Sequence, residues 1–152
     1  MLKKILIITF CSIFLFGCEY EPIYKSNINN EINIKINSIE GDSSINSIIR
    51  SGLNKYSNKK TKKEYEVNIT SNYNKNEVSR DKTGKITNYK GNISINFEVN
   101  INNKEKRDFR FEKNFNIKNT LNNFEQLDYE NSLKKNMTSA ILIEFIKKLL
   151  IN

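Results

Sequence analysis

A run of strictly alternating side chains gives the strongest structural signal in this sequence. Every second residue between positions 93 and 101 is apolar, and the set consists of Ile93, Ile95, Phe97, Val99 and Ile101. The residues between them are Asn, Ser and Glu. Because successive side chains of a β-strand point to opposite faces, this pattern predicts a strand with one buried and one solvated face. Such a strand is stable only when other strands pair with it and a second layer covers its apolar face.

Three other segments share this period of two. Residues 31–37 alternate isoleucine with polar residues, and residues 65–73 place tyrosines and aliphatic side chains on one face. Residues 109–117 place three phenylalanines and one isoleucine on one face, which Lys113 interrupts. Together with the central run, these segments predict four strands.

Short polar segments separate the last three strands. Residues 79–84 are rich in turn-forming residue types, and residues 102–104 (Asn-Asn-Lys) make a tight reversal. Ile86 and Tyr89 extend the third strand toward its start, where Gly91 predicts a β-bulge. Because connections this short join antiparallel neighbours, the sequence predicts a meander of the second, third and fourth strands.

Two segments show the spacing of an amphipathic helix. Asp42-Ser43-Ser44 offers an N-cap to a helix of about 14 residues with one apolar stripe. A second helix follows Thr120, and residues 140–151 are apolar on most sides, so this segment is either buried between layers or presents a face to a partner. The order β-α-β-β-β-α predicts an α+β fold, a two-layer sandwich in which two helices cover one face of a four-stranded, mainly antiparallel sheet.

The residue types for most enzymatic chemistry are missing. The sequence has no histidine, its only cysteines are Cys11 and Cys18, and its five glycines are not clustered. Histidine-based catalysis, ordinary zinc sites and phosphate-cradling loops are therefore excluded. Glu125, Asp128 and Glu130 lie close together, but they fall at the start of a helix, where the helix dipole favours acidic residues. We expect no enzyme, no metal and no cofactor.

The first eighteen residues predict export and lipid attachment. A positive start is followed by twelve mainly apolar residues, which are too few to cross a bilayer as a helix and fit a signal peptide at residues 1–17. Leu15-Phe16-Gly17-Cys18 resembles the bacterial lipobox, although Phe16 departs from its usual small residue. That resemblance implies a thioether-linked lipid on Cys18 and firm membrane anchoring by several acyl chains. Residues 18–30, which contain the only proline, predict a lipidated tether before a domain at 31–152.

The chain has more basic than acidic residues, and two explanations of this excess are open. Of the 25 basic residues, Lys3 and Lys4 leave with the signal peptide, so 23 remain against 17 acidic residues. An anionic membrane or glycolipid would explain the excess, and so would A/T-rich codon usage, which favours Asn, Ile and Lys. Only four of the basic residues are arginine, the usual side chain for forked contacts to phosphates and bases. We do not expect a nucleic-acid partner.

The start of the tether resembles a known family. Tyr20 and Pro22-Ile23-Tyr24 match the segment after the lipid cysteine in the lipoprotein of the lipopolysaccharide translocon, the LptE family, in its α-proteobacterial form. Glu19 departs from that pattern, where glycine is usual. The predicted element order is also similar to that of the family, whose two helices pack on a four-stranded sheet.

The resemblance implies a function at the outer membrane of a Gram-negative cell envelope. A member of this family is anchored by lipid on the periplasmic side, plugs and helps assemble a large β-barrel partner, and assists the transport and insertion of lipopolysaccharide. Basic residues in turns would bind the anionic phosphates of lipopolysaccharide. The candidates fall in two turns at opposite ends of the third strand: Arg80, Lys82 and Lys85 in one, and Lys104, Lys106 and Arg107 in the other.

Other interpretations remain open for these residues and for the chain. The basic turn residues are also explained as solvated loop charges. The domain would look the same in a generic envelope lipoprotein that acts as a protein-binding module, or in a transport-accessory lipoprotein that carries lipid.

Overall fold

The structure is a computed structural model that describes residues 32–57, 61, 63–102, 104–119 and 122–151. The predicted signal peptide (1–17), Cys18 and the tether (18–30) lie outside these residues. The elements follow the order β-α-β-β-β-α. They are β1 (Asn33–Gly41), α3 (Ser43–Asn54), β2 (Glu64–Arg80), β3 (Ile86–Ile101), β4 (Glu105–Lys118) and α4 (Asn123–Ile151).

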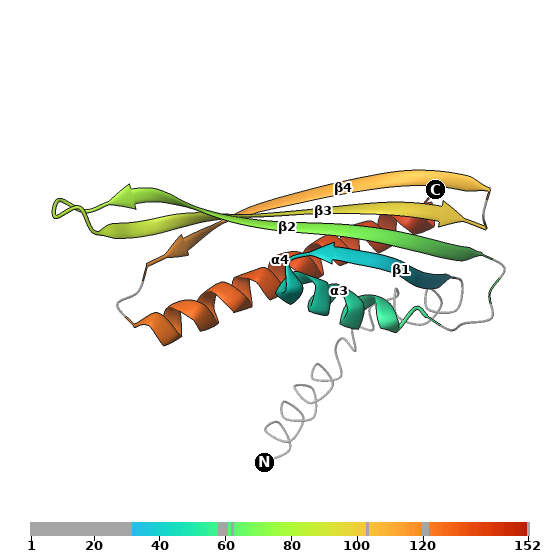
Figure 1. The fold of residues 1–152 in the computed structure, drawn as a ribbon, viewed down its shortest axis with the longest axis horizontal. Coiled ribbons are helices and arrows are strands. Elements are labelled where there is room, and N and C mark those ends of the chain that lie inside the picture. The colour runs from blue at the N-terminus through green and yellow to red at the C-terminus, as the bar shows by residue number, and fades with distance from the viewer. Residues whose placement is uncertain (1–31, 58–60, 62, 103, 120–121, 152) are drawn as a thin grey trace, which may run out of the picture.

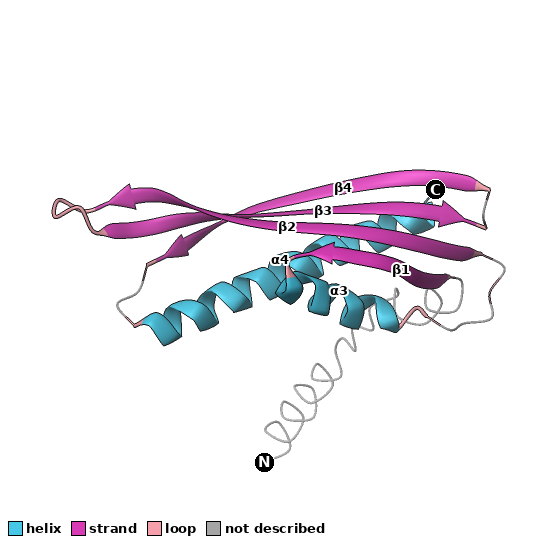
Figure 2. Cartoon of the chain, in the orientation of Figure 1, coloured by secondary structure: helices cyan, strands magenta, loops and turns pink. Residues whose placement is uncertain are grey.

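The four strands form one sheet in the order β1-β2-β3-β4, and both helices lie on the same face of it (Figure 1, Figure 2). β1 pairs parallel with β2, whereas β2, β3 and β4 pair antiparallel through short turns. The predicted α+β sandwich and the meander of the last three strands are therefore confirmed. The other face of the sheet carries mostly Asn, Ser, Thr and charged side chains.

The core fills the space between the sheet and the helices. Its centre is a group of aromatic rings: Phe97 of β3 stacks on Phe145 of α4 with ring centroids 4.0 Å apart, and the edge of Phe111 of β4 meets Phe97 at 5.9 Å. Phe97 and Phe145 are fully buried. These contacts place the apolar face of β3, which the alternation predicted, under the C-terminal half of α4.

The first helix begins at the predicted cap. The Asp42 carboxylate accepts a hydrogen bond from the Ile45 backbone N–H at 2.9 Å, which satisfies one of the free donors of the first turn. Farther along α3, a Cβ on Gly52 would come within 2.6 Å of the Leu142 side chain, so glycine allows the two helices to pack closely. No helix in the described part of the chain is both long and apolar enough to cross a bilayer.

Two details differ from the sequence-based prediction. The pairing of β2 with β3 is regular at Gly91, and its irregularities lie instead between Glu77 and Arg80, so the bulge predicted near Gly91 is wrong. Gly91 lies under the Phe115 ring, which would be 2.5 Å from a Cβ at this position. Glycine is therefore required at this position because the Phe115 ring occupies the space that a side chain would need.

Strands also extend beyond their apolar runs. β1 continues through Gly41, and β2 continues to Arg80 although residues 74–77 are all polar. The end of β2 and the start of β3 form a hairpin that projects past the rest of the sheet (Figure 1). The N-terminal half of α4 lies below this hairpin in the same view.

The C-terminal part of α4, which the sequence predicts to be either buried or exposed to a partner, has side chains on both sides. Ile141, Leu142, Phe145, Ile146 and Leu149 are buried in the core, whereas Ile143 is 59% exposed on the opposite side. Residues 140–151 are thus mostly buried between layers, and they also present the apolar side chains of Ile143 and Ile151 to solvent. Tyr129, nearer the start of the same helix, is exposed.

Candidate functional site

The turn between β2 and β3 is held by one aspartate. The Asp81 carboxylate accepts hydrogen bonds from the backbone N–H groups of Thr83 at 2.8 Å and Lys85 at 3.0 Å, and from the Thr83 hydroxyl at 2.6 Å. These bonds, with that of the Thr83 hydroxyl the strongest, lower the pKa of Asp81 below its ordinary value. Gly84 completes the turn with a φ of 85°, which favours glycine. The backbone of this turn is therefore held in a defined conformation.

The basic residues of this turn differ in how they are held. Arg80 forms an ion pair with Glu77 and donates a hydrogen bond to the Gly84 carbonyl oxygen at 2.9 Å. Lys82 and Lys85 are exposed, and neither forms an ion pair with any residue that the structure describes. Lys118 of β4 is exposed near the base of the same hairpin, where it lies opposite Asn88.

The turn between β3 and β4 carries the other predicted set. Lys104 and Lys106 are exposed, and the Arg107 guanidinium donates a hydrogen bond to the Glu105 carboxylate at 2.7 Å. Lys106 lines a shallow hollow on the polar face of the sheet together with Glu66, Glu98 and Asp108. Acidic neighbours therefore offset much of the positive charge at this end.

The structure places the two turns far apart, as the topology predicts. β3 has 16 residues, which corresponds to about 50 Å of extended chain. The turns lie at opposite ends of the sheet in Figure 1. One compact ligand therefore cannot touch both sets.

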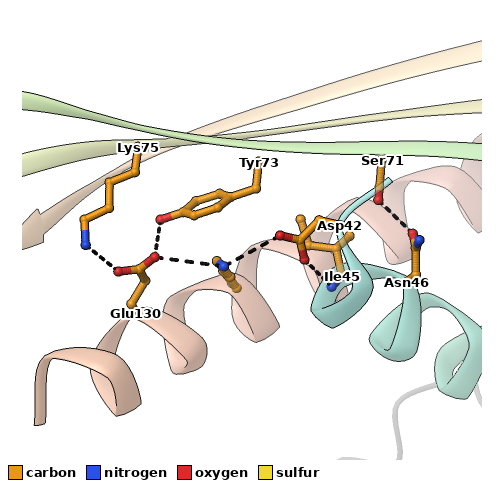
Figure 3. Close-up of polar contacts among 8 residues, drawn as sticks. Asp42, Ile45, Asn46, Ser71, Tyr73, Lys75 and Glu130 are labelled. Atoms are coloured by element: carbon orange, nitrogen blue, oxygen red, sulfur yellow. Dashed lines mark hydrogen bonds and ion pairs between the residues drawn. The ribbon is translucent and has the colours of Figure 1, made fainter. Parts of the chain in front are cut away.

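A cluster of polar side chains joins β2 to the two helices, and we call Tyr73, Lys75, Glu130, Lys134 and Asp42 the polar bridge (Figure 3). The Glu130 carboxylate of α4 forms an ion pair with Lys75 of β2 at 2.6 Å and accepts a hydrogen bond from the Tyr73 hydroxyl at 2.7 Å. Lys134 lies 3.9 Å from Glu130 and 3.8 Å from Asp42, the N-cap of α3. The bridge connects β2, α4 and the start of α3.

The bridge is partly shielded from solvent, and this shifts the pKa values of two of its members. Burial alone would raise the pKa of Glu130, but hydrogen bonds from Lys75 and Tyr73 and the charges of both lysines bring it below its ordinary value. Burial raises the pKa of Tyr73 strongly, and its hydrogen bond to Glu130 adds to this effect. At neutral pH the carboxylate is charged and the phenol is neutral.

The three acidic residues at the start of α4 do not act together. Glu125 and Asp128 are exposed, whereas the Glu130 side chain is only 13% exposed and belongs to the polar bridge. No group of three or more metal-ligating side chains occurs within the described ranges. Sequence reasoning missed the bridge because Lys75 and Glu130 lie 55 residues apart, and Glu130 was grouped with its neighbours Glu125 and Asp128.

Comparisons with known proteins were informative only at the level of structure. No protein-family model and no curated protein matches the sequence. The rare lipoprotein B from Shewanella oneidensis has a TM-score of 0.57 and 13% sequence identity, over 80% of this chain and 97% of that chain. The domain shares its fold with solved bacterial lipoproteins. A minor lipoprotein from Acinetobacter baumannii is a further example, with a TM-score of 0.51 and 10% identity over 80% of this chain and 95% of that chain.

These similarities concern the fold, because sequence identity is low throughout. They cover nearly the whole length of both solved chains. The α+β domain therefore corresponds to a complete folded unit in those lipoproteins.

Proposed function

We propose that this protein is a lipid-anchored lipoprotein on the periplasmic side of the outer membrane, where it plugs and helps assemble the β-barrel of the lipopolysaccharide translocon and assists lipopolysaccharide insertion. The proposal is supported by two features that occur together in this chain, an N-terminal sequence motif and the fold of the domain. A lipobox-like segment ending in Cys18 and a Tyr20, Pro22-Ile23-Tyr24 motif stand ahead of a domain with the fold of solved lipoproteins. The LptE family, which the motif resembles, includes rare lipoprotein B.

The proposed role is one of binding, without catalysis, metal or cofactor. The β2–β3 turn presents Lys82 and Lys85 to solvent, and Asp81 holds the backbone from which they extend. An anionic group would meet two exposed ammonium groups there. Lipid A phosphates are such groups.

Two experiments test this function. The first is mild detergent extraction of the C-terminally tagged protein from its native envelope, followed by mass spectrometry of the intact protein and its partners. We expect a mature chain that begins at an acylated Cys18 and a large outer-membrane β-barrel in roughly equal amount. Recovery of the lipidated chain without a barrel would contradict the translocon role and favour a different protein-binding or lipid-carrying function.

The second experiment assigns the lipopolysaccharide contact. The triple variant R80Q/K82Q/K85Q should bind lipopolysaccharide more weakly and still co-purify with the barrel. The matched control K104Q/K106Q/R107Q removes the same charge at the opposite end of β3 and should bind normally. Equal loss in both variants would indicate a general charge effect, and unchanged binding of the first variant would refute the assignment.

A further inference from the structure

A groove runs between α3 and α4 on the side of the helices that faces away from the sheet. Its volume is about 460 Å³, within the range of pockets that bind small molecules. Its lining is mainly apolar, with Ile48 of α3 and Leu142, Ile143 and Ile146 of α4, and three serines contribute small polar edges. The close packing of Gly52 against Leu142 lets the apolar floor continue from one helix to the other.

Positive charge marks both ends of this groove. Lys135 of α4 and Lys55 after α3 are exposed and line it, and no acidic side chain does so among the described residues. The two helices run in the same direction, because Lys134 lies near Asp42 at the start of α3 and Leu142 contacts Gly52 ten residues later. Lys135 and Lys55 therefore lie about 15 Å apart along the helices, since each helical residue rises 1.5 Å. An apolar trough with a cation at each end complements an amphiphile that carries negative charge.

The chain enters the domain beside this groove. The backbone N–H of Ile34, at the start of β1, donates a hydrogen bond to the carbonyl oxygen of Tyr56 at 3.0 Å. Tyr56 and Lys55 form one end of the groove. Only 13 residues separate Cys18 from Ile32, and fully extended they reach about 45 Å. A lipid on Cys18 would therefore hold this end of the helical layer within reach of the leaflet in which it is inserted.

We propose that the α3–α4 groove is a docking site for an anionic phospholipid of that leaflet, whose acyl chain lies on Ile48, Leu142, Ile143 and Ile146. The lysine at the headgroup end of the groove, Lys55 or Lys135, meets its phosphate, and the other lysine meets the phosphate of a neighbouring lipid in the same leaflet. The inference rests on the lipid anchor of the proposed function but does not require the barrel. A second copy of the chain is a poorer occupant, because two such grooves would bring lysines together. The polar face of the sheet, with Glu66, Glu98 and Asp108, would then face away from the membrane.

The test uses the full chain purified with its anchor and reconstituted into nanodiscs of either phosphatidylglycerol or phosphatidylcholine. Hydroxyl-radical footprinting is read at Ile143 in the groove and at Val78 on the projecting hairpin, which are 59% and 60% exposed. We expect oxidation of Ile143 to fall several-fold in phosphatidylglycerol discs relative to detergent and little in phosphatidylcholine discs. Oxidation of Val78 should stay constant in both.

Charge variants give the matched control. K55Q/K135Q should lose the protection of Ile143, because two lysines near an anionic surface together change occupancy about 30-fold. K90Q/K118Q removes the same charge from β3 and β4, away from the groove, and should retain the protection of Ile143. Unchanged oxidation of Ile143, protection of Val78 in its place, or equal protection in phosphatidylcholine discs would overturn the proposal.

Failure of the anchor can be told apart from failure of the groove. If the intact mass shows no acyl chains, the lipoprotein assignment is wrong, and phosphatidylglycerol vesicles added to the purified chain then test the groove directly. Protection of Ile143 by those vesicles would support the groove, and no protection would overturn it. Concentration-dependent protection in detergent without lipid would overturn it in favour of a dimer.

Discussion

Replacement of Glu130 by glutamine tests whether the polar bridge fastens the N-terminal part of α4 to β2. The glutamine side chain has almost the same shape and can still accept the hydrogen bond of Tyr73. Because glutamine is neutral, it cannot form an ion pair with the Lys75 ammonium group, which lies 2.6 Å from the wild-type carboxylate. The electrostatic attraction to Lys134 is lost as well. The substitution therefore removes charge with little change in packing.

The expected loss of stability follows from exposure and geometry. A hydrogen bond to a charged group contributes about 1.5–3 kcal/mol, and a fully exposed ion pair contributes at most about 1 kcal/mol. The side chains of Glu130 and Lys75 are 13% and 29% exposed, so the pair falls between these limits. We expect E130Q to lower the free energy of unfolding by about 1–2 kcal/mol, or Tm by about 4–8 °C for a domain of this size.

Urea unfolding followed by circular dichroism measures this loss, and Asp128→Asn provides the control. Asp128 is an exposed carboxylate two residues away on the same helix, so D128N should change stability by less than about 0.5 kcal/mol. Hydrogen exchange should also show faster opening of residues 123–134 in E130Q than in D128N. Equal stability of the two variants would show that the bridge does not fasten the helix.

The same bridge predicts a pH dependence with a definite sign. Folding lowers the pKa of Glu130 below its ordinary value of 4.5, so its stabilising effect is fully present above that pH. The effect is lost as the pH falls below 4.5 and through the folded-state pKa. The difference in stability between wild type and E130Q should be constant near pH 7 and shrink toward zero in acid, whereas a constant difference would contradict the assignment.

Three other substitutions test the packing. Phe145→Ala should cost about 3–5 kcal/mol in urea unfolding because the ring is buried against Phe97, while exposed Phe124→Ala should cost less than about 0.5 kcal/mol, and similar losses would refute this account of the core. Gly91→Ala should cost about 1–3 kcal/mol because its Cβ would lie 2.5 Å from the Phe115 ring; an unchanged unfolding midpoint would argue against that contact. Lys113→Val should increase self-association, measured by light scattering, because it removes an inward charge from edge strand β4, and Lys113→Arg should not; a monomeric valine variant would count against this role.

The regular parts of the fold could be predicted because their signals are local. Alternation in β3 and the cap at Asp42 each depend on residues within one element, and both are confirmed. The length of β2 could not be predicted, because residues 74–77 are polar and become strand only by pairing with β3. The β-bulge predicted at Gly91 failed for a related reason: the Phe115 ring that requires a glycine there lies on the next strand.

The candidate site shows the same division. The two basic turns were recognisable from their composition, and the structure places them at opposite ends of β3 as predicted. In the sequence, Lys113 interrupts an apolar strand, and the structure explains it by an ion pair with Glu144 of α4. Contacts between distant segments, such as this pair and the polar bridge, have no signature in a single sequence.

The position of α4 at the end of the chain sets the order in which the domain can be completed. Phe97 is stacked on Phe145, which is synthesised 48 residues later. A chain that crosses a membrane from its N-terminus onward would pair its strands first and leave the apolar face of the sheet bare until the last helix arrives. During that interval the exposed phenylalanines and isoleucines would favour aggregation, so export of the chain under the proposed function would require a protection of this face that the finished domain no longer needs.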